Sequence, residues 1–91
     1  MDFEWDRAKS ARNAAARGLP FDLAALLFDG PVLERVDARR EFGEVRVRAI
    51  GKVGDRLLHC VYTDRGDVRR IISLRAANRK ERDGYRATFE G

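Results

Sequence analysis

Residues 69–82 gather side chains that are suited to bind a phosphate group and to move protons beside it. The candidates are Arg70, Ser73, Arg75, Arg79, Lys80, Glu81 and Arg82. A guanidinium group can form two parallel hydrogen bonds with a phosphate, and the free N–H groups of a helix N-terminus add to this attraction. Because the segment leads from a strand into a helix start, it predicts an anion site there. The same residues also fit a solvated helix end in which Glu81 only caps the helix.

The strand part of this segment does not indicate which of its faces is buried. Strict alternation places one set of side chains together, namely Arg69, Ile71, Ser73 and Arg75. The opposite face then carries Val68, Arg70, Ile72 and Leu74. Both sets mix charged with apolar residues, so the pattern leaves the buried face open.

Three further residues could carry chemistry outside this segment. Lys9 and Asn13 share one face of a predicted helix, where they could contact a phosphate or a partner protein, or form an ordinary exposed stripe. His59 could act as a general base because its ordinary pKa lies near neutrality, but a partly buried structural histidine is the favoured interpretation. Cys60, next to it in a predicted strand, should face the opposite side as a small core residue.

Other catalytic signatures are absent from the sequence. It contains no glycine-rich phosphate loop, no Gly-x-Ser-x-Gly turn and no Cys/His spacing typical of a metal site. One histidine and one cysteine cannot build a closed zinc site. We therefore expect no metal and no other cofactor.

The charge of the chain is unevenly distributed. The net charge is +4, and residues 65–91 hold eight Lys and Arg against four Asp and Glu, whereas residues 1–64 are balanced. We therefore expect a polyanion to dock on the C-terminal part. Of the 19 basic residues 16 are arginine, which suits phosphate binding and base stacking but equally fits a nucleotide bias of the genome.

Length and hydropathy restrict the class of protein. The 91 residues are 44% hydrophobic and 37% charged, which predicts a single globular domain over residues 1–91. The longest apolar run, residues 23–28, is far shorter than the roughly 20 residues of a membrane span. The acidic start of the chain lacks the features of a secretory signal. We therefore expect a cytoplasmic protein without membrane contact.

Capping residues predict three helices. Asp6 and Gly18 bound a first helix over residues 6–17, and Asp22 should cap a short second helix that ends near Phe28. Asn78, followed three residues later by Glu81, has the form of a capping box that starts a last helix, ending near residue 86. Aromatic residues that flank or line the first two helices are expected in the core, namely Phe3, Trp5, Phe21 and Phe28.

Between the second and the last helix the pattern becomes strand-like. After the turn at residues 29–31, runs rich in Val, Ile and Leu follow at residues 32–37, 45–50, 57–63 and 68–75. In the second run Arg46 and Arg48 alternate with apolar residues, which predicts one wet face. Short glycine-containing connections favour hairpins. The fold class is therefore α+β, with two N-terminal helices, a four-stranded antiparallel sheet and a C-terminal helix.

Along nearly its whole length, the chain resembles the BrnT toxins. The residues that carry the resemblance are Phe3-Glu4-Trp5-Asp6, Lys9, Asn13, Gly18, Phe21, Ala24, Phe28, Gly43-Glu44, Arg46, Ala49-Ile50-Gly51, Val61-Tyr62-Thr63, Arg70, Ile72-Ser73, Arg75, Glu81-Arg82 and Tyr85. The order of the whole set is specific, although no single piece is decisive.

The resemblance implies a RelE-like fold and a ribonuclease toxin of a type II toxin-antitoxin system that inhibits translation. It also implies a BrnA-like antitoxin, a ribbon-helix-helix protein that neutralises the toxin. The two would form a heterotetrameric complex that binds operator DNA through the antitoxin. RelE-like nucleases generally lack a paired-histidine centre and use basic and polar groups to position RNA.

On this basis we expect metal-independent cleavage, in which the 2′-hydroxyl of the RNA attacks the adjacent phosphate. The expected catalytic residues are Arg75, with Arg70 or Arg79, for charge stabilisation, Glu81 as the base, and Tyr85 or Lys9 as the acid. The expected RNA-binding residues are Ser73, Arg79, Lys80, Arg82 and Arg46. Two other roles stay open: a module that binds RNA without cleaving it, and a basic surface that chiefly binds an acidic antitoxin.

Overall fold

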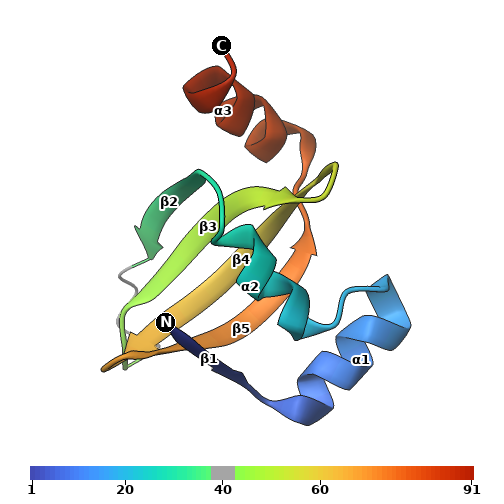
Figure 1. Cartoon of the computed structure of the whole chain (residues 1–91), viewed down its shortest axis with the longest axis vertical. Coiled ribbons are helices and arrows are strands. Elements are labelled where there is room, and N and C mark those ends of the chain that lie inside the picture. Colours follow the sequence, from blue (N-terminus) through green and yellow to red (C-terminus); the bar gives the residue numbers. More distant parts are fainter. Residues whose placement is uncertain (38–42) are drawn as a thin grey trace.

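Figure 1 shows the computed structural model of the chain, which describes residues 1–37 and 43–91, as a twisted sheet with helices around it. The elements in chain order are β1 (Asp2–Trp5), α1 (Arg7–Arg17), the 3-10 helix η1 (Phe21–Leu23), α2 (Ala24–Leu27), β2 (Val32–Asp37), β3 (Arg46–Val53), β4 (Arg56–Arg65), β5 (Val68–Ala76) and α3 (Arg79–Phe89). No helix in these ranges is long and apolar enough to span a membrane.

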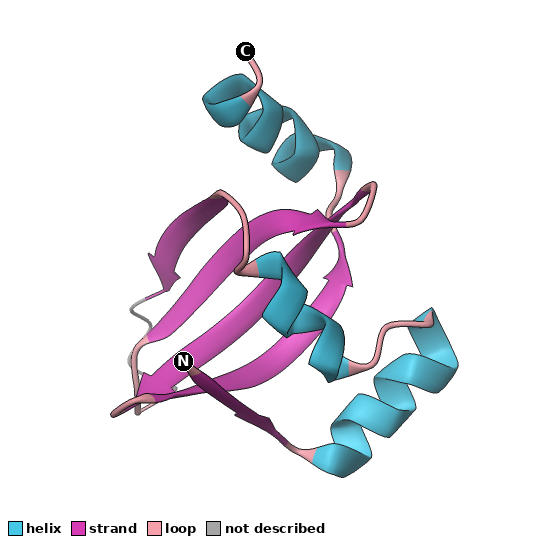
Figure 2. Cartoon of the chain, in the orientation of Figure 1, coloured by secondary structure: helices cyan, strands magenta, loops and turns pink. Residues whose placement is uncertain are grey.

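The described residues form a sheet with the strand order β1-β5-β4-β3-β2. The four predicted strands are confirmed as β2 to β5, and each pairs with its neighbour in antiparallel fashion. The predicted sheet was nevertheless incomplete, because β1 adds a fifth strand that pairs with β5 in parallel. The fold is therefore α+β with a mixed sheet. Figure 2 shows the strands as one continuous surface with α2 crossing it.

The first helix begins and ends where its capping residues predict. The Asp6 carboxylate accepts a hydrogen bond of 3.0 Å from the Lys9 backbone N–H, and Gly18 ends α1 in the left-handed conformation with φ at 70°. The prediction that Asp22 caps a second helix is wrong. Asp22 lies inside η1, whose first turn follows Pro20, and no side chain caps η1 or α2.

The capping box that predicts the last helix is confirmed. The Asn78 side chain accepts a hydrogen bond from the Glu81 N–H, and the Glu81 carboxylate accepts one from the Asn78 N–H, each 2.9 Å long. The helix continues to Phe89, beyond the predicted end near residue 86. In Figure 1 it stands past the end of β5.

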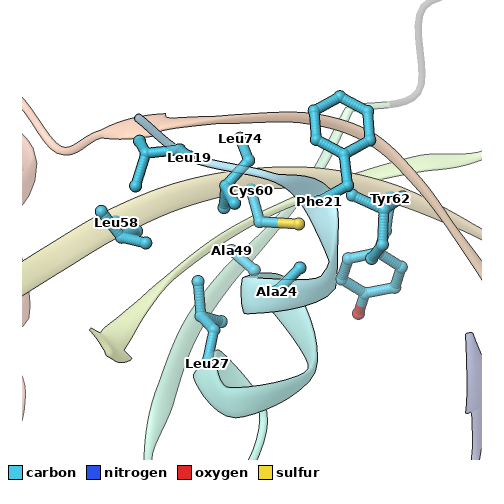
Figure 3. Packing of buried hydrophobic residues seen from close by; sticks show 10 residues of the cluster. Leu19, Phe21, Ala24, Leu27, Ala49, Leu58, Cys60, Tyr62 and Leu74 are labelled. Carbon is cyan, nitrogen blue, oxygen red and sulfur yellow. The ribbon is translucent and has the colours of Figure 1, made fainter. Parts of the chain in front are cut away.

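One face of the sheet, here called the inner face, carries the main core. Ala49 on β3, Leu58 and Cys60 on β4, and Leu74 on β5 pack there against Leu27 of α2 and against the segment before it (Figure 3). Phe21 is buried, and Phe3, Trp5 and Phe28 pack against the same cluster, as their positions predicted. Cys60 is fully buried, and this burial raises the pKa of its thiol to about 12.

The opposite face, here called the outer face, carries polar residues and a smaller apolar cluster. Leu57, Ala77 and Tyr85 form that cluster beneath α3, with Leu33 and Ile50 packed against it. Alternation and register place further residues on this face, namely Arg46, Arg48, His59, Val61, Ser73 and Arg75. His59 and Cys60 therefore face opposite sides, as predicted.

The strict alternation predicted for β5 is wrong at one position. Val61 pairs with Ser73 but Tyr62 pairs with Ile71, so the register shifts at Ile72. Such a bulge inserts one residue, after which the faces exchange. Ile71 and Leu74 consequently both enter the inner-face core.

Candidate functional site

A pocket of about 590 Å³ lies between α1 and the outer face of β3, β4 and β5; we call it the cationic pocket. Its charged and polar lining consists of Lys9, Arg12, Asn13, Asp37, Arg46, Arg48, His59, Ser73 and Arg75. Five of these described lining residues are Lys or Arg and one is an acid. A concave surface with this charge concentrates polyanions, because low-dielectric walls focus the field.

The first wall of the cationic pocket is one face of α1. Lys9, Arg12, Asn13 and Ala16 line it at the spacing that places helical residues on one side. Asn13 attaches this helix to the sheet, since its amide nitrogen donates to the carbonyl oxygens of Leu19 at 2.7 Å and Leu74 at 2.9 Å. Leu74 lies in the part of β5 that has no β1 neighbour, because β1 pairs only with residues 68–71. The free end of β5 is thus where α1 docks and carries Lys9 to the pocket.

The second wall comes from β3 and β2. Arg46 and Arg48 are two residues apart on β3, so both face the pocket, which confirms the predicted wet face of this strand. Arg48 forms an ion pair of 3.3 Å with Asp37, while half of the Arg48 side chain stays exposed. Arg46 lies 3.9 Å from Glu44. Because half of the Arg48 side chain is exposed, its guanidinium group is accessible to a phosphate from solution.

Arg75 occupies the edge of the pocket, where it is held by Glu81. Its two terminal nitrogens donate to the two carboxylate oxygens of Glu81 at 2.8 and 2.9 Å. This bidentate contact lowers the pKa of the Glu81 carboxyl to about 2, despite the opposing effect of burial, and raises the pKa of Arg75. Glu81 also caps α3, so the helix N-terminus already holds an anion of its own chain.

His59 lines the cationic pocket beside Arg75 and Glu81. It pairs across the sheet with Arg75, and its Nε2 is 3.6 Å from the nearer Glu81 oxygen. Only 4% of the residue is exposed, and neither ring nitrogen has a hydrogen-bond partner within the described residues. Burial, followed by the positive charge of Arg75, lowers the pKa of His59. Both effects favour the neutral form of the imidazole.

Four of the ten predicted site residues line the cationic pocket, namely Lys9, Arg46, Ser73 and Arg75. Lys80 and Glu81 line a second, neighbouring pocket on the same face. Glu81 was the expected base, but its pKa is shifted in the direction opposite to the one that a base near neutrality needs. Its contacts are those of a residue that positions Arg75 and His59.

The other four predicted residues lie outside both pockets. Arg70 is 3.6 Å from Glu4 beside β1, and Arg79 is 89% exposed on the surface of α3. Arg82 donates to the Ala77 carbonyl oxygen at 2.8 Å. Tyr85 is buried, and its hydroxyl donates to the Pro31 carbonyl oxygen at 3.2 Å, so it supports the core rather than the pocket.

Two cations of the pocket, Arg12 and Arg48, were not among the predicted site residues. The sequence could have identified both. Arg12 lies about one helical turn after Lys9, and Arg48 lies two residues after Arg46 and so points to the same side of the strand. The excess charge of residues 65–91 was a poor guide, since Arg75 is the only cation from that segment among the described lining residues of the pocket. No three His, Cys, Asp or Glu side chains in the described ranges gather as metal ligands would.

Comparison with known proteins places this geometry in a family. No curated protein matches the chain significantly. A family model described as the ribonuclease toxin BrnT of type II toxin-antitoxin systems matches residues 5–81, a range that includes every residue lining the cationic pocket. Because this match covers most of the 91 residues, the chain belongs to the BrnT family of ribonuclease toxins of type II toxin-antitoxin systems.

Proposed function

We propose that this protein is an endoribonuclease that binds and cleaves RNA in the cationic pocket and thereby inhibits translation. The observation that carries the proposal is the gathering of five cations from α1, β3 and β5 around one concave surface that also includes His59, whose ring nitrogens have no hydrogen-bond partner within the described residues. A surface that only attracts nucleic acid needs the cations but has no use for the histidine. The RelE-like assignment of the fold belongs to the same proposal.

The reaction that fits these residues is attack of the RNA 2′-hydroxyl on the adjacent phosphorus. The 2′ oxygen loses its proton and bonds to phosphorus, the bond to the 5′ oxygen breaks, and that oxygen takes up a proton. The products are a 2′,3′-cyclic phosphate and a 5′-hydroxyl, so neither a protein nucleophile nor a metal is required. The protein has to hold the phosphate, stabilise its additional negative charge and move two protons.

We assign these tasks to the residues of the pocket. Arg48 and Arg75 stabilise the phosphorane, Arg46 and Ser73 hold neighbouring parts of the backbone, and Lys9 supplies the proton of the leaving oxygen. These groups reach the pocket from three different elements. A phosphate between them therefore meets donors from several sides, which orients it for attack.

His59 replaces Glu81 as the proposed base. Its lowered pKa keeps the imidazole neutral, whereas the carboxylate of Glu81, with a pKa of about 2, is too weak a base to take a proton from a hydroxyl near neutral pH. Both His59 nitrogens are shielded from solvent in the free protein. A phosphate that draws Arg75 away from Glu81 opens this shield, and Glu81 is then left to stabilise the protonated imidazole.

The test is single-turnover cleavage of total RNA by the purified protein in the presence of EDTA. We expect cleavage with EDTA present, 2′,3′-cyclic phosphate ends, and a loss of about a hundredfold in the rate for Arg48→Ala. Arg79→Ala is the matched control, because it removes an arginine that lies outside both pockets. RNA that is bound but stays intact would reduce the protein to a binding module, and cleavage abolished by EDTA would refute the metal-independent reaction.

We further propose that the neutralising partner is a BrnA-like ribbon-helix-helix antitoxin, and that the two proteins form a heterotetramer that binds operator DNA through the antitoxin. Membership of a type II toxin-antitoxin family supports a protein antitoxin. An acidic antitoxin segment over the cationic pocket would block RNA by occupying the same cations. Because the proposed activity inhibits translation, we place it in the cytoplasm. Co-expression with a BrnA-like antitoxin should abolish RNA cleavage and yield a complex of four chains.

A further inference from the structure

A second pocket, of about 400 Å³, lies on the outer face between α3 and the strands β2 and β3; we call it the helix pocket. Its volume falls in the range of roughly 300–1,000 Å³ that is usual for pockets that hold small organic groups. Leu33 and Ile50 form its apolar part. Its polar groups include Arg35, Asn78 and Lys80 and the carboxylates of Glu34 and Glu81. The helix pocket is therefore less cationic than the cationic pocket, and it offers apolar contact beside its hydrogen-bonding groups.

The two pockets are adjacent and share two lining residues. Arg48 and His59 line both of them, so the groups that we place at the reacting phosphate also form the boundary of the helix pocket. Whatever occupies the helix pocket therefore lies next to the proposed place of the reacting phosphate. In a strand of RNA, the group that lies this close to a phosphate and combines an apolar face with a polar edge is a nucleobase.

Gly84 gives an independent reason to regard the helix pocket as a binding site. It lies in the interior of α3, where glycine is less favourable than alanine because it has more backbone freedom to lose. Neither packing nor backbone geometry requires glycine here. A Cβ at this position would meet only the Leu33 Cδ2 atom, at 3.8 Å, and Gly84 is not among the glycines with positive φ. Gly84 lines the helix pocket, and because it has no side chain it leaves the pocket open.

We propose that the helix pocket binds a nucleobase of the RNA whose scissile phosphate lies in the cationic pocket, and that it sets the base preference of cleavage. This inference rests on the proposed function and adds a base-recognition site to it. The base would place its ring against Leu33 and Ile50, with its polar edge toward Asn78 and Lys80. Contacts of this kind carry sequence preference, whereas contacts to phosphates do not.

The binding arm of the test uses the intact wild-type chain and an RNA that cannot be cleaved. Nuclear magnetic resonance spectra are recorded during titration with a 2′-O-methyl tetranucleotide of mixed sequence and, separately, with its abasic counterpart. We expect both to shift signals of the cationic pocket, and only the tetranucleotide with bases to shift the Gly84 amide and the Leu33 and Ile50 methyl groups. Equal shifts with both probes, or no shift at these three residues, would overturn the proposal.

The cleavage arm compares Gly84→Leu and Gly84→Ala with Ala87→Leu, an exposed position of α3 outside the helix pocket. Alanine and leucine both favour a helix more than glycine does. Unfolding curves verify that each of the three variants folds. On an RNA library of random sequence, we expect Gly84→Leu to reduce the base preference beside the scissile bond about tenfold, Gly84→Ala to have a smaller effect, and Ala87→Leu to have none.

The two proposals fail in different ways. A wild-type chain that does not cleave RNA contradicts the proposed function, and the binding arm then still decides whether the helix pocket takes a base. A wild-type chain that cleaves, with an unchanged base preference in Gly84→Leu, contradicts the base site alone. If Gly84→Leu instead loses the antitoxin and retains its base preference, the helix pocket is a protein-docking site.

Discussion

At the scale of single residues, the contact between Arg75 and Glu81 links the fold to the chemistry. The two side chains are joined by two hydrogen bonds of 2.8 and 2.9 Å, and the same carboxylate caps α3 and lies 3.6 Å from His59. One acidic side chain thus fixes the start of a helix, the direction of an arginine and the surroundings of a histidine. Its low pKa records how strongly the folded state favours its charged form.

Replacement of this carboxylate should change how the protein responds to acid. Folding lowers the pKa of Glu81 from 4.5 to about 2, so its charged form stabilises the fold above pH 4.5 and this contribution is lost as the pH falls toward 2. Glu81→Gln should therefore lower stability near neutral pH by about 1–3 kcal/mol and make the loss of stability between these pH values shallower. Urea unfolding across this range measures both effects. Asp83→Asn, which changes an exposed acid of the same helix, should retain the wild-type slope.

The proposed base should be visible in the pH dependence of cleavage. The pKa of His59 is lowered by burial and by Arg75, so its neutral form persists below the ordinary value of 6.5. We expect the cleavage rate to fall on acidification only below that value, and His59→Ala to lose about 10²–10⁴-fold in rate together with this limb of the profile. Cys60→Ala, on the opposite side of the same strand, should retain the limb. A profile that is the same in His59→Ala and in wild type would remove His59 from the reaction.

At the scale of elements, local signals in the sequence predict the ends of α1 and the start of α3, because a cap depends on residues within one turn. Two features depend on distant parts of the chain and were missed. β1 has only four residues, and the parallel pairing with β5 that forms it joins segments far apart in sequence. The bulge at Ile72 allows Ile71 and Leu74 to share one core, which no alternating pattern can express.

A glycine on β3 tests how closely the elements of the inner face approach one another. A Cβ at Gly51 would lie 2.8 Å from the Leu27 Cγ atom and 3.0 Å from the Leu27 carbonyl oxygen, so α2 would have to move. Gly51→Ala should lower the free energy of unfolding by about 1–3 kcal/mol, as overpacking of a core does. Gly30→Ala is the control, since no atom lies within 4 Å of its Cβ position. Chemical denaturation measures the free energy of unfolding of both variants. Equal stability of the two would show that α2 moves at little energetic cost.

At the scale of the whole molecule, the cationic pocket is assembled by the topology rather than by any one segment. Its cations come from α1, from β3 and from the end of β5, and these parts meet because β1 stops short and leaves an edge of β5 for α1. A count of charges along the chain cannot detect this arrangement. Most of the excess charge of residues 65–91 lies elsewhere, as the ion pair of Arg70 with Glu4 and the exposed Arg79 show. The residues of the site were thus predictable in type, and in part by position, but their convergence was not.

This convergence makes the salt dependence of RNA binding a property of the pocket. Each phosphate that the protein neutralises on a single strand releases counterions and contributes about −0.7 to the slope of log K against log salt concentration. With a non-cleavable 2′-O-methyl RNA, Arg48→Ala should make the slope shallower by about 0.7, and so should Arg46→Ala, because each removes one phosphate contact. Arg79→Ala, of equal charge but outside the pocket, should leave the slope unchanged. Fluorescence anisotropy at several salt concentrations measures it. If the three variants change the slope equally, the net charge of the molecule binds RNA. The cationic pocket would then not be the specific binding site.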